Sequence, residues 1–305
     1  MTSYKIVLEA LRPAQWIKNV SIFAAPMLTG KLFDPTVTLL ASNAFVVFCF
    51  LSSSSYLIND ILDAPKDKLH PFKRLRPIAR GALDKKTAFM VAIFLLISGL
   101  FIASTVNSNF LFISIVFIVL QYLYSLVLKR KAIFDILGIA LFFIIRAYAG
   151  ELATGWHLPV WIMLTVIFLS LFIASGKRRS ELLRSGTTTR AALSEYGTSL
   201  LNFYTTMFAV ATLICYAMFT YFVQEKIQFD GLLHEFIIKY FPNWLDRKWY
   251  MVTLIPIIVG IMRYGQIIFQ MEEAERPEKI LASDIPLIVA IFSWGAMMLA
   301  IIYVL

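Results

Sequence analysis

The 305-residue sequence contains few charged residues and only two cysteines. Charged side chains make up 15% of the chain and hydrophobic ones 59%, with a mean hydropathy of +0.76. A soluble domain of this length carries more charge, so this composition excludes an ordinary water-soluble fold. Cys49 and Cys215 both lie in apolar runs, which excludes a disulfide framework. The sequence therefore predicts a protein that is surrounded by lipid.

We expect neither a cleavable signal nor an interdomain linker. Residues 1–20 mix Glu9, Arg12 and Lys18 with apolar side chains, unlike a signal peptide, and no Gly/Ser-rich stretch interrupts the chain. We therefore expect one catalytic domain over residues 1–305. Apolar runs long enough to cross a hydrocarbon core of about 30 Å are present instead, and they predict an all-α bundle of about nine transmembrane helices. They lie near residues 15–33, 37–58, 86–106, 109–128, 133–153, 158–175, 198–224, 249–266 and 284–304.

Apart from Arg146, the basic residues lie between the apolar runs or near their ends, so we expect no nucleic-acid partner despite a net charge of +9. With the N-terminus inside, about 22 Lys and Arg residues fall on the cytoplasmic side and 5 on the other. The positive-inside rule then predicts an N-in, C-out protein of the cytoplasmic (inner) membrane, with its charged site facing the cytoplasm. The outward stretch 225–250 is typical of an interfacial helix, and we assign it no chemistry.

An acidic run follows the second apolar segment. Asn59, Asp63 and Asp67 are spaced four residues apart, so they share one face if this stretch is helical, and Asp60 lies beside them. Such oxygen ligands suit Mg²⁺, which a few carboxylates hold while substrate phosphates complete its coordination. We take Asp60, Asp63 and Asp67 as catalytic candidates, and Asn59, Asp63 and Asp67 as metal ligands. The alternative is a solvated helix end that happens to be acidic.

Basic residues lie next to the acidic run. Lys73 and Arg76 follow it on a stretch that Pro71 and Pro77 stiffen, which favours phosphate binding, although such cations also serve topology alone. His70 can bond a phosphate or cap the turn. Further candidates for substrate binding lie at the next two cytoplasmic ends: Tyr124, Lys129, Asp135, Lys177, Arg178 and Glu181. Lys177 and Glu181, with Arg184, fall on one helical stripe that can also be a salt-bridged surface.

Three polar residues within or beside predicted spans complete the candidates. Arg146 falls inside a span, where a guanidinium group is costly unless it pairs or lines a polar cavity. It is a candidate for substrate binding, and an ion pair with Glu151 is the structural alternative. Lys18 and Asn19 either point into the same cavity or anchor the first helix.

These motifs resemble the UbiA superfamily of intramembrane prenyltransferases, whose first signature, N-D-x-x-D-x-x-x-D, matches residues 59–67. The stretches RPAQWIKN, YSLVLKRKAIFD, RAYAGELATG and GKRRSEL, together with MRY at 262–264, are similar to a branch that transfers phosphoribosyl groups. The resemblance covers nearly all of the chain. It departs in ERPEKILASDIPL, which lacks the glycines and the basic residue expected after its aspartate, so we assign that loop no role.

The resemblance implies a donor and an acceptor. The donor is phosphoribosyl diphosphate (PRPP), and the acceptor is a polyprenyl phosphate whose tail lies in the membrane. Where other members carry a second aspartate-rich motif, this chain has KRRSELLR, which suits extra phosphate better than extra metal. On this reading Lys177, Arg178, Lys129 and Lys18 hold the 5-phosphate and the lipid phosphate. Lys73 and Arg76 support the diphosphate, and Glu181 or Asp135 bonds ribose hydroxyls.

Two other functions stay open. The same fold can serve an enzyme that moves a prenyl group from a prenyl diphosphate to an aromatic or other acceptor. A transporter also carries charges inside the membrane, but the sequence shows no inverted repeat and no matching pair of Gly/Pro-broken spans. The oligomeric state and the lipid chain length cannot be inferred from these patterns.

Overall fold

The structure is a computed structural model that describes residues 3–69, 73–185, 195–223, 248–271, 274, 277, 280 and 283–303. All regular secondary structure in these residues is helical, and none of them lies in a β-strand. A helix satisfies its backbone hydrogen bonds internally, which a segment in lipid must do because no water is available there. The predicted all-α membrane fold is confirmed.

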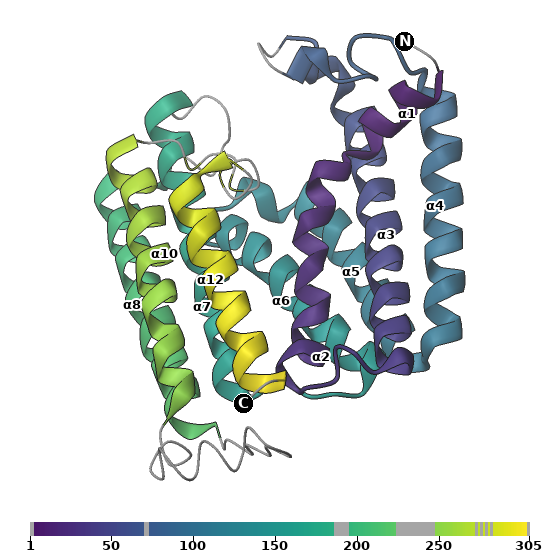
Figure 1. Cartoon of the computed structure of the whole chain (residues 1–305). Coiled ribbons are helices and arrows are strands. Elements are labelled where there is room, and N and C mark those ends of the chain that lie inside the picture. The colour runs from purple at the N-terminus through teal and green to yellow at the C-terminus, as the bar shows by residue number, and fades with distance from the viewer. Residues whose placement is uncertain are drawn as a thin grey trace. The chain divides into compact units, whose positions relative to one another are not determined.

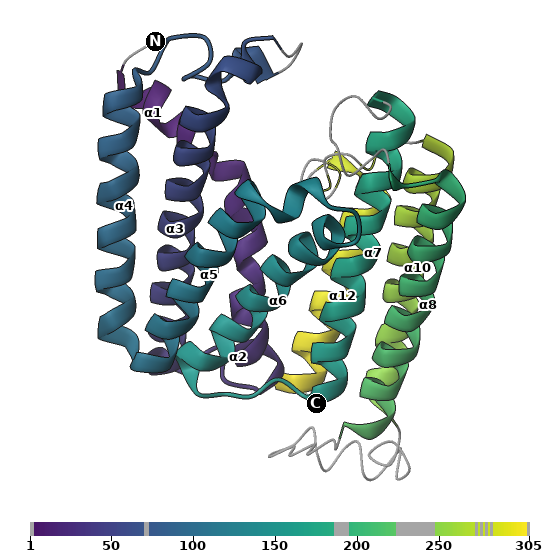
Figure 2. The same ribbon diagram turned by 180° about the vertical axis from the view of Figure 1, so that it is seen from behind.

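The chain divides into two compact units (Figures 1 and 2). Unit 1 holds residues 1–26, 33–131 and 145–156, and unit 2 holds residues 27–32, 132–144 and 157–305. Helix α6 (Phe134–Thr154) contributes its first part to unit 2 and its second part to unit 1. Compactness does not decide how many catalytic domains a chain holds, so the single domain over residues 1–305 stays a prediction.

Unit 1 is built around two long helices, α3 and α4, which lie side by side in both views (Figures 1 and 2). Small residues bring these helices together: Ser54 donates a hydrogen bond of 2.8 Å to the carbonyl of Ala92, and Gly99 lies against Leu51. The remaining elements of the unit complete the bundle. In chain order the elements are α1 (Ser3–Leu11), the 3-10 helix η1 (Pro13–Phe23), α2 (Ala24–Leu28), α3 (Pro35–Asp67), η2 (Lys73–Leu75), α4 (Lys85–Val106), α5 (Ser108–Leu126) and η3 (Leu128–Arg130).

Two helices of unit 1 begin at capping side chains. Asp84 accepts a hydrogen bond of 2.9 Å from the backbone N–H of Thr87 at the start of α4, and bonding to Thr87 holds the pKa of Asp84 below its ordinary value. Asn107 accepts one of 2.8 Å from the N–H of Phe110 at the start of α5. Such caps satisfy backbone donors that the first turn of a helix leaves unpaired.

Unit 2 consists of α7 (Val160–Ser185), α8 (Thr198–Phe222), η6 (Trp249–Thr253), α10 (Leu254–Gln266), the π-helical turn η7 (Ile267–Met271) and α12 (Ile285–Tyr303), besides its part of α6. Helices α7 and α8 pack along each other, as do α10 and α12. A Cβ atom on Gly176 would lie 2.4 Å from the side chain of Ile268, so a larger residue at this position would force that side chain to move. Trp294 and Thr253 both hydrogen bond to Tyr216, which joins α12, η6 and α8.

Eight helices in the described part of the chain are long and apolar enough to cross a membrane. The predicted span at residues 15–33 differs, because η1 and the five-residue α2 stand there instead of one α-helix. A 3-10 helix rises about 2.0 Å per residue and an α-helix about 1.5 Å, so η1 and α2 together extend roughly 30 Å. That is about the thickness of the hydrocarbon core, and the ninth crossing stays a prediction.

Helices α3 and α7 are longer than predicted. The predicted spans end at residues 58 and 175, but α3 continues to Asp67 and α7 to Ser185. The extension of α7, GKRRSELLRS, is rich in Lys, Arg, Glu and Leu, which are good helix formers. Helix α3 continues although Pro65 lies within it. Both charged motifs therefore lie on helices. Most of the outward stretch 225–250 is outside the described residues, which resume at residue 248.

Candidate active site

The acidic run forms the last turns of α3. The side chains of Asp60 and Asp67 are buried, at 4% and 6% exposed, whereas that of Asp63 is 37% exposed. Asn59 is half-buried. All four residues lie on α3, which is the condition under which Asn59, Asp63 and Asp67 share one face, and Asp63 is the most accessible of the three carboxylates.

Two arginines hold Asp60 and Asp67. Arg12, which follows α1, donates from Nη2 to both oxygens of Asp60 at 2.5 and 2.8 Å. Arg76, which follows η2, donates from Nη1 to Asp60 at 3.1 Å and to Asp67 at 2.7 Å. Two buried carboxylates are thus compensated by two guanidinium groups that come from different parts of the sequence.

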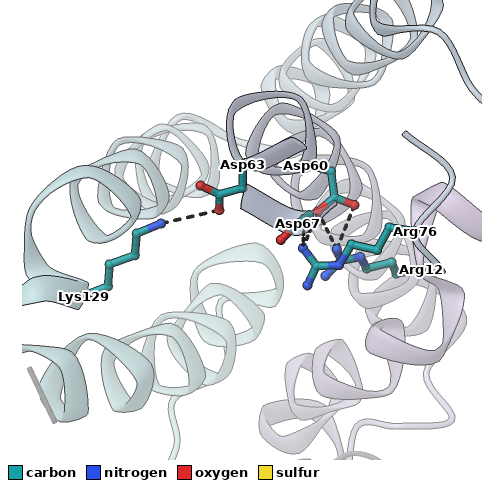
Figure 3. Close-up of polar contacts among 6 residues, drawn as sticks. All are labelled: Arg12, Asp60, Asp63, Asp67, Arg76 and Lys129. Carbon is teal, nitrogen blue, oxygen red and sulfur yellow. Dashed lines mark hydrogen bonds and ion pairs between the residues drawn. The ribbon is translucent and has the colours of Figure 1, made fainter. Parts of the chain in front are cut away.

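Asp63 extends toward Lys129 of η3, whereas Asp60 and Asp67 lie beside the two arginines (Figure 3). The distance from Nζ of Lys129 to Oδ2 of Asp63 is 3.7 Å, and both side chains are about one-third exposed. An ion pair this long and this exposed contributes little free energy, about 1 kcal/mol at most. A ligand can therefore separate the two side chains at low cost.

The residues at the end of α3 fit a magnesium ion by donor type. In the described residues, no three His, Cys, Asp or Glu side chains converge on one point as a complete metal site would require. Mg²⁺ seldom needs such a cage, because it usually binds one or two carboxylates and takes further oxygens from substrate phosphates and water. Asp63 and Asp67 supply carboxylates and Asn59 an amide oxygen, and the metal set Asn59, Asp63 and Asp67 stays a prediction.

Arg146 lies in a buried polar network of unit 1, inside a membrane span. Its Nε donates to the side-chain oxygen of Asn19 at 2.7 Å, and its guanidinium carbon lies 5.0 Å from the ring centre of Phe117. Nη2 of Arg146 is 3.4 Å from the hydroxyl of Ser52. The backbone of η1 comes so close to α6 that a Cβ atom on Gly150 would lie 2.0 Å from the carbonyl oxygen of Ile22. This network joins η1, α3 and α6, and a role in substrate binding stays a prediction.

The other candidates of unit 1 have varied surroundings. Lys18 donates to the side-chain oxygen of Gln15 at 2.5 Å, within η1. Lys73 and Tyr124 are both half-buried, on η2 and α5. His70 lies outside the described residues. Substrate contacts at these four positions stay predictions.

Unit 2 has a buried charged cluster of its own. Nε of Arg178 on α7 lies 2.6 Å from Oδ2 of Asp135 at the start of α6, and Nη1 of Arg178 contacts Glu181. The side chains of Arg178 and Asp135 are fully buried, and that of Glu181 is 10% exposed. The neighbouring Lys177 is only half-buried. Three residues predicted to bind substrate, Asp135, Arg178 and Glu181, therefore form a set of buried ion pairs, and their contact with substrate stays a prediction.

Tyr196 completes this cluster. Its hydroxyl donates to Oδ1 of Asp135 at 2.7 Å and accepts a hydrogen bond of 2.5 Å from the backbone N–H of Ile133. Burial, followed by the hydrogen bond to Asp135, raises the pKa of Tyr196 above its ordinary value, so the hydroxyl stays protonated. Ile133 has a φ of 67°, a left-handed conformation that is unfavourable for a β-branched residue. Tyr196 therefore helps to hold a strained turn.

Two of these residues were not among the predicted site residues. Arg12 stands 48 residues before Asp60, and the only sequence signal for it is its place in the RPAQWIKN stretch. Tyr196 stands 61 residues after Asp135, and no local pattern marks it. Long-range pairs of this kind cannot be inferred from spacing along one helix.

The fold and the charged helix end together define an integral membrane protein with several spanning helices and an acidic, arginine-bound cluster at the end of one helix. Residues 20–281 match the UbiA prenyltransferase family. The chain belongs to this family.

Curated relatives are similar over nearly their whole length. The decaprenyl-phosphate phosphoribosyltransferase of Mycolicibacterium smegmatis is 36% identical over 97% of this chain and 92% of its own. The protein of the same name from Corynebacterium glutamicum is 33% identical over 98% of this chain and 87% of its own. Among solved structures, a UbiA homolog from Archaeoglobus fulgidus bound to DMAPP and Mg²⁺ has a TM-score of 0.68 at 21% identity, covering 98% of this chain and 99% of that one. That likeness confirms the fold.

Proposed function

We propose that this enzyme transfers a 5-phosphoribosyl group from PRPP to a polyprenyl phosphate of the decaprenyl type and releases diphosphate. The observation that carries the proposal is the similarity to a decaprenyl-phosphate phosphoribosyltransferase that is 36% identical over 97% of this chain. The acidic end of α3, with its arginines and Lys129, supports the proposal because it offers both metal ligands and phosphate-binding cations.

The proposed donor site uses Mg²⁺ as its cofactor. Asp63 and Asp67, with Asn59, would hold the ion, and Mg²⁺ in such a site acts as a Lewis acid and a template for the departing diphosphate. The fold relative from Archaeoglobus fulgidus was solved with Mg²⁺ and DMAPP, which supports a divalent ion in this family. Lys129 is well placed to move from Asp63 to a phosphate oxygen, because its ion pair is long and partly exposed.

The reaction needs little acid–base chemistry from the protein. A phosphate oxygen of the lipid acceptor, already anionic at neutral pH, forms a bond to C1 of the ribose while the bond from C1 to the diphosphate oxygen breaks. The electron pair of that bond leaves with the diphosphate. Arg76, Lys73 and Lys129 would stabilise the charge on the leaving group, and Lys177 and Lys18 are proposed for the remaining phosphates.

The surroundings of Arg178 favour a role other than phosphate binding. The prediction that it binds a phosphate stays untested, and its complete burial against Asp135 and Glu181 favours a structural role. Glu181 and Asp135, predicted to bond ribose hydroxyls, are proposed to serve the same cluster.

We further propose that the site faces the cytoplasm across the inner membrane, as the distribution of Lys and Arg favours. PRPP carries several negative charges and cannot cross a bilayer unaided. Its site therefore has to open to the compartment that contains it.

The test uses PRPP labelled in the ribose, decaprenyl phosphate and membranes that contain the protein. We expect label in the lipid extract with Mg²⁺ and none with EDTA. Prenyl transfer is the alternative that membership of the family supports, so a parallel reaction receives a labelled prenyl diphosphate and an aromatic acceptor. Transfer of the prenyl label without transfer of the ribose label would contradict the proposal.

A further inference from the structure

The chain carries a pair of arginines whose chemistry differs from that of the metal ligands beside them. We propose that Arg12 binds a phosphate group of the donor together with Arg76, and that Asp60 is the positioning residue that holds the two guanidinium groups side by side. This inference rests on the proposed function, since it assigns residues to the same donor site. It gives Asp60 a role other than metal binding.

The contacts of Asp60 bring the two arginines together. Its Oδ1 accepts hydrogen bonds from Arg12 at 2.5 Å and from Arg76 at 3.1 Å, and its Oδ2 accepts from Arg12 at 2.8 Å. Because both arginines contact one oxygen atom, their guanidinium groups lie within a few ångströms of each other. Two like charges repel each other at this distance, and the carboxylate of Asp60 offsets that repulsion.

The carboxylate of Asp60 is more buried than the two arginine side chains that contact it. The side chain of Asp60 is 4% exposed, whereas those of Arg12 and Arg76 are each 27% exposed. The carboxylate is therefore covered by the two arginines, which keep part of their surface accessible. Each guanidinium group has five N–H donors, and the ion pairs in the described residues use Nη2 of Arg12 and Nη1 of Arg76. A planar donor group with accessible edges is well suited to phosphate oxygens.

The backbone of Arg12 adopts an unusual conformation. Its φ of 56° and ψ of 61° place a non-glycine residue in the left-handed region, directly before Pro13. Such a conformation persists only where the surroundings impose it, and it is more frequent at functional sites than elsewhere. Here the bonds to Asp60 and the ring of Tyr56, 5.2 Å from the guanidinium carbon, fix the side chain. A relaxed backbone would direct the guanidinium group elsewhere.

The same contacts explain why Asp60 does not ligate the metal. Both of its oxygens accept from guanidinium groups, so a divalent cation on Asp60 would lie against two positive charges. Asp63 meets a single lysine at 3.7 Å and is 37% exposed. Asp67 is intermediate, because its Oδ2 accepts a hydrogen bond from Arg76 at 2.7 Å. The three carboxylates therefore differ in their partners: Asp60 contacts two arginines, Asp67 contacts one, and Asp63 contacts a lysine and is the most exposed.

The test measures binding of inorganic pyrophosphate to the purified protein at saturating Mg²⁺, which requires neither ribose nor lipid. We expect Arg12→Gln to weaken pyrophosphate binding roughly tenfold or more, as loss of a hydrogen bond to a charged group does. Arg12→Lys keeps the charge but loses the forked donor geometry of the guanidinium group, so it should retain part of the affinity that Arg12→Gln loses. Arg80→Gln is the matched control: Arg80 pairs with Glu9 at 2.7 Å on the surface, and its loss should leave the affinity unchanged.

Asp60→Asn separates positioning from metal binding. We expect it to weaken pyrophosphate binding and to raise KM for PRPP with little change in kcat, while the Mg²⁺ concentration for half-maximal rate stays that of the wild type. A tenfold higher Mg²⁺ requirement with unchanged pyrophosphate affinity would make Asp60 a ligand and overturn the inference. Wild-type affinity in a folded Arg12→Gln protein would overturn it as well. A wrong donor assignment shows differently: the wild type then makes no lipid-linked phosphoribose, yet still binds pyrophosphate through Arg12.

Discussion

The charged clusters of the two units differ in how far they are buried. In unit 1, Asp60 and Asp67 are covered, but Arg12, Arg76, Asp63 and Lys129 each keep about a quarter to a third of their side-chain surface exposed. In unit 2, Arg178 and Asp135 have none. Partly exposed ion pairs can exchange one partner for a ligand, whereas fully buried ones cannot open without exposing an uncompensated charge. This difference favours a binding role for the first cluster and a structural role for the second.

Arg178→Met gives the largest expected effect and tests the structural role of the unit 2 cluster. The substitution leaves Asp135 and Glu181 buried without their cation, which costs about 3–5 kcal/mol of unfolding free energy. Thermal unfolding in detergent should show a much lower midpoint. Arg184→Met, at an exposed position of the same helix, is the control and should unfold like the wild type. An unchanged midpoint for Arg178→Met would contradict the structural role of the unit 2 cluster.

Asp63→Asn tests whether the unit 1 cluster serves the reaction and not the stability of the fold. The side chain is partly exposed, so unfolding should stay close to that of the wild type. The rate of lipid labelling should fall roughly 100-fold or more, because loss of a residue that only supports a metal ligand already costs about 10 to 100-fold. The measurement is initial rate against Mg²⁺ concentration. A stable protein with a wild-type rate would remove Asp63 from the site.

Tyr196→Phe tests how much one hydrogen-bonded hydroxyl adds to the buried cluster. It removes the bond to Asp135 and the acceptor for Ile133, at an expected cost of about 1–3 kcal/mol. The raised pKa gives a pH signature as well. The folded protein keeps the tyrosine proton above pH 10, where the unfolded chain loses it. Wild-type stability contributed by this group is therefore complete below pH 10 and declines above it, and this decline should be absent in Tyr196→Phe.

Glu9→Gln gives the smallest expected effect and sets the baseline for exposed pairs. Glu9 and Arg80 are each more than one-third exposed at a distance of 2.7 Å. Loss of this pair should cost less than about 1 kcal/mol and change the rate less than about twofold. Unfolding and lipid-labelling assays on the same preparation check both values. A large loss of rate would extend the binding cluster to the end of α1.

The sequence was sufficient to predict what depends on local pattern. Composition predicted the membrane fold, and the spacing of Asn59, Asp63 and Asp67 predicted their place on one helix. The 3-10 helix η1 was not predicted, because the search for apolar runs does not distinguish a 3-10 helix from an α-helix. The different partners of the aspartates were not predicted either. Arg12 and Arg76 are distant from Asp60 in the sequence, and only the fold brings them into contact with it. Nor did any sequence pattern connect Tyr196 to Asp135.

The most direct measurement of the metal site is the binding of Mn²⁺, a spectroscopically visible substitute for Mg²⁺ with the same preference for oxygen ligands. Electron paramagnetic resonance counts the free ion in the presence of pyrophosphate. We expect the wild type and Arg80→Gln to bind Mn²⁺ alike and Asp63→Asn to lose most of that binding. Undiminished Mn²⁺ binding by a folded Asp63→Asn protein would contradict a divalent ion at the end of α3.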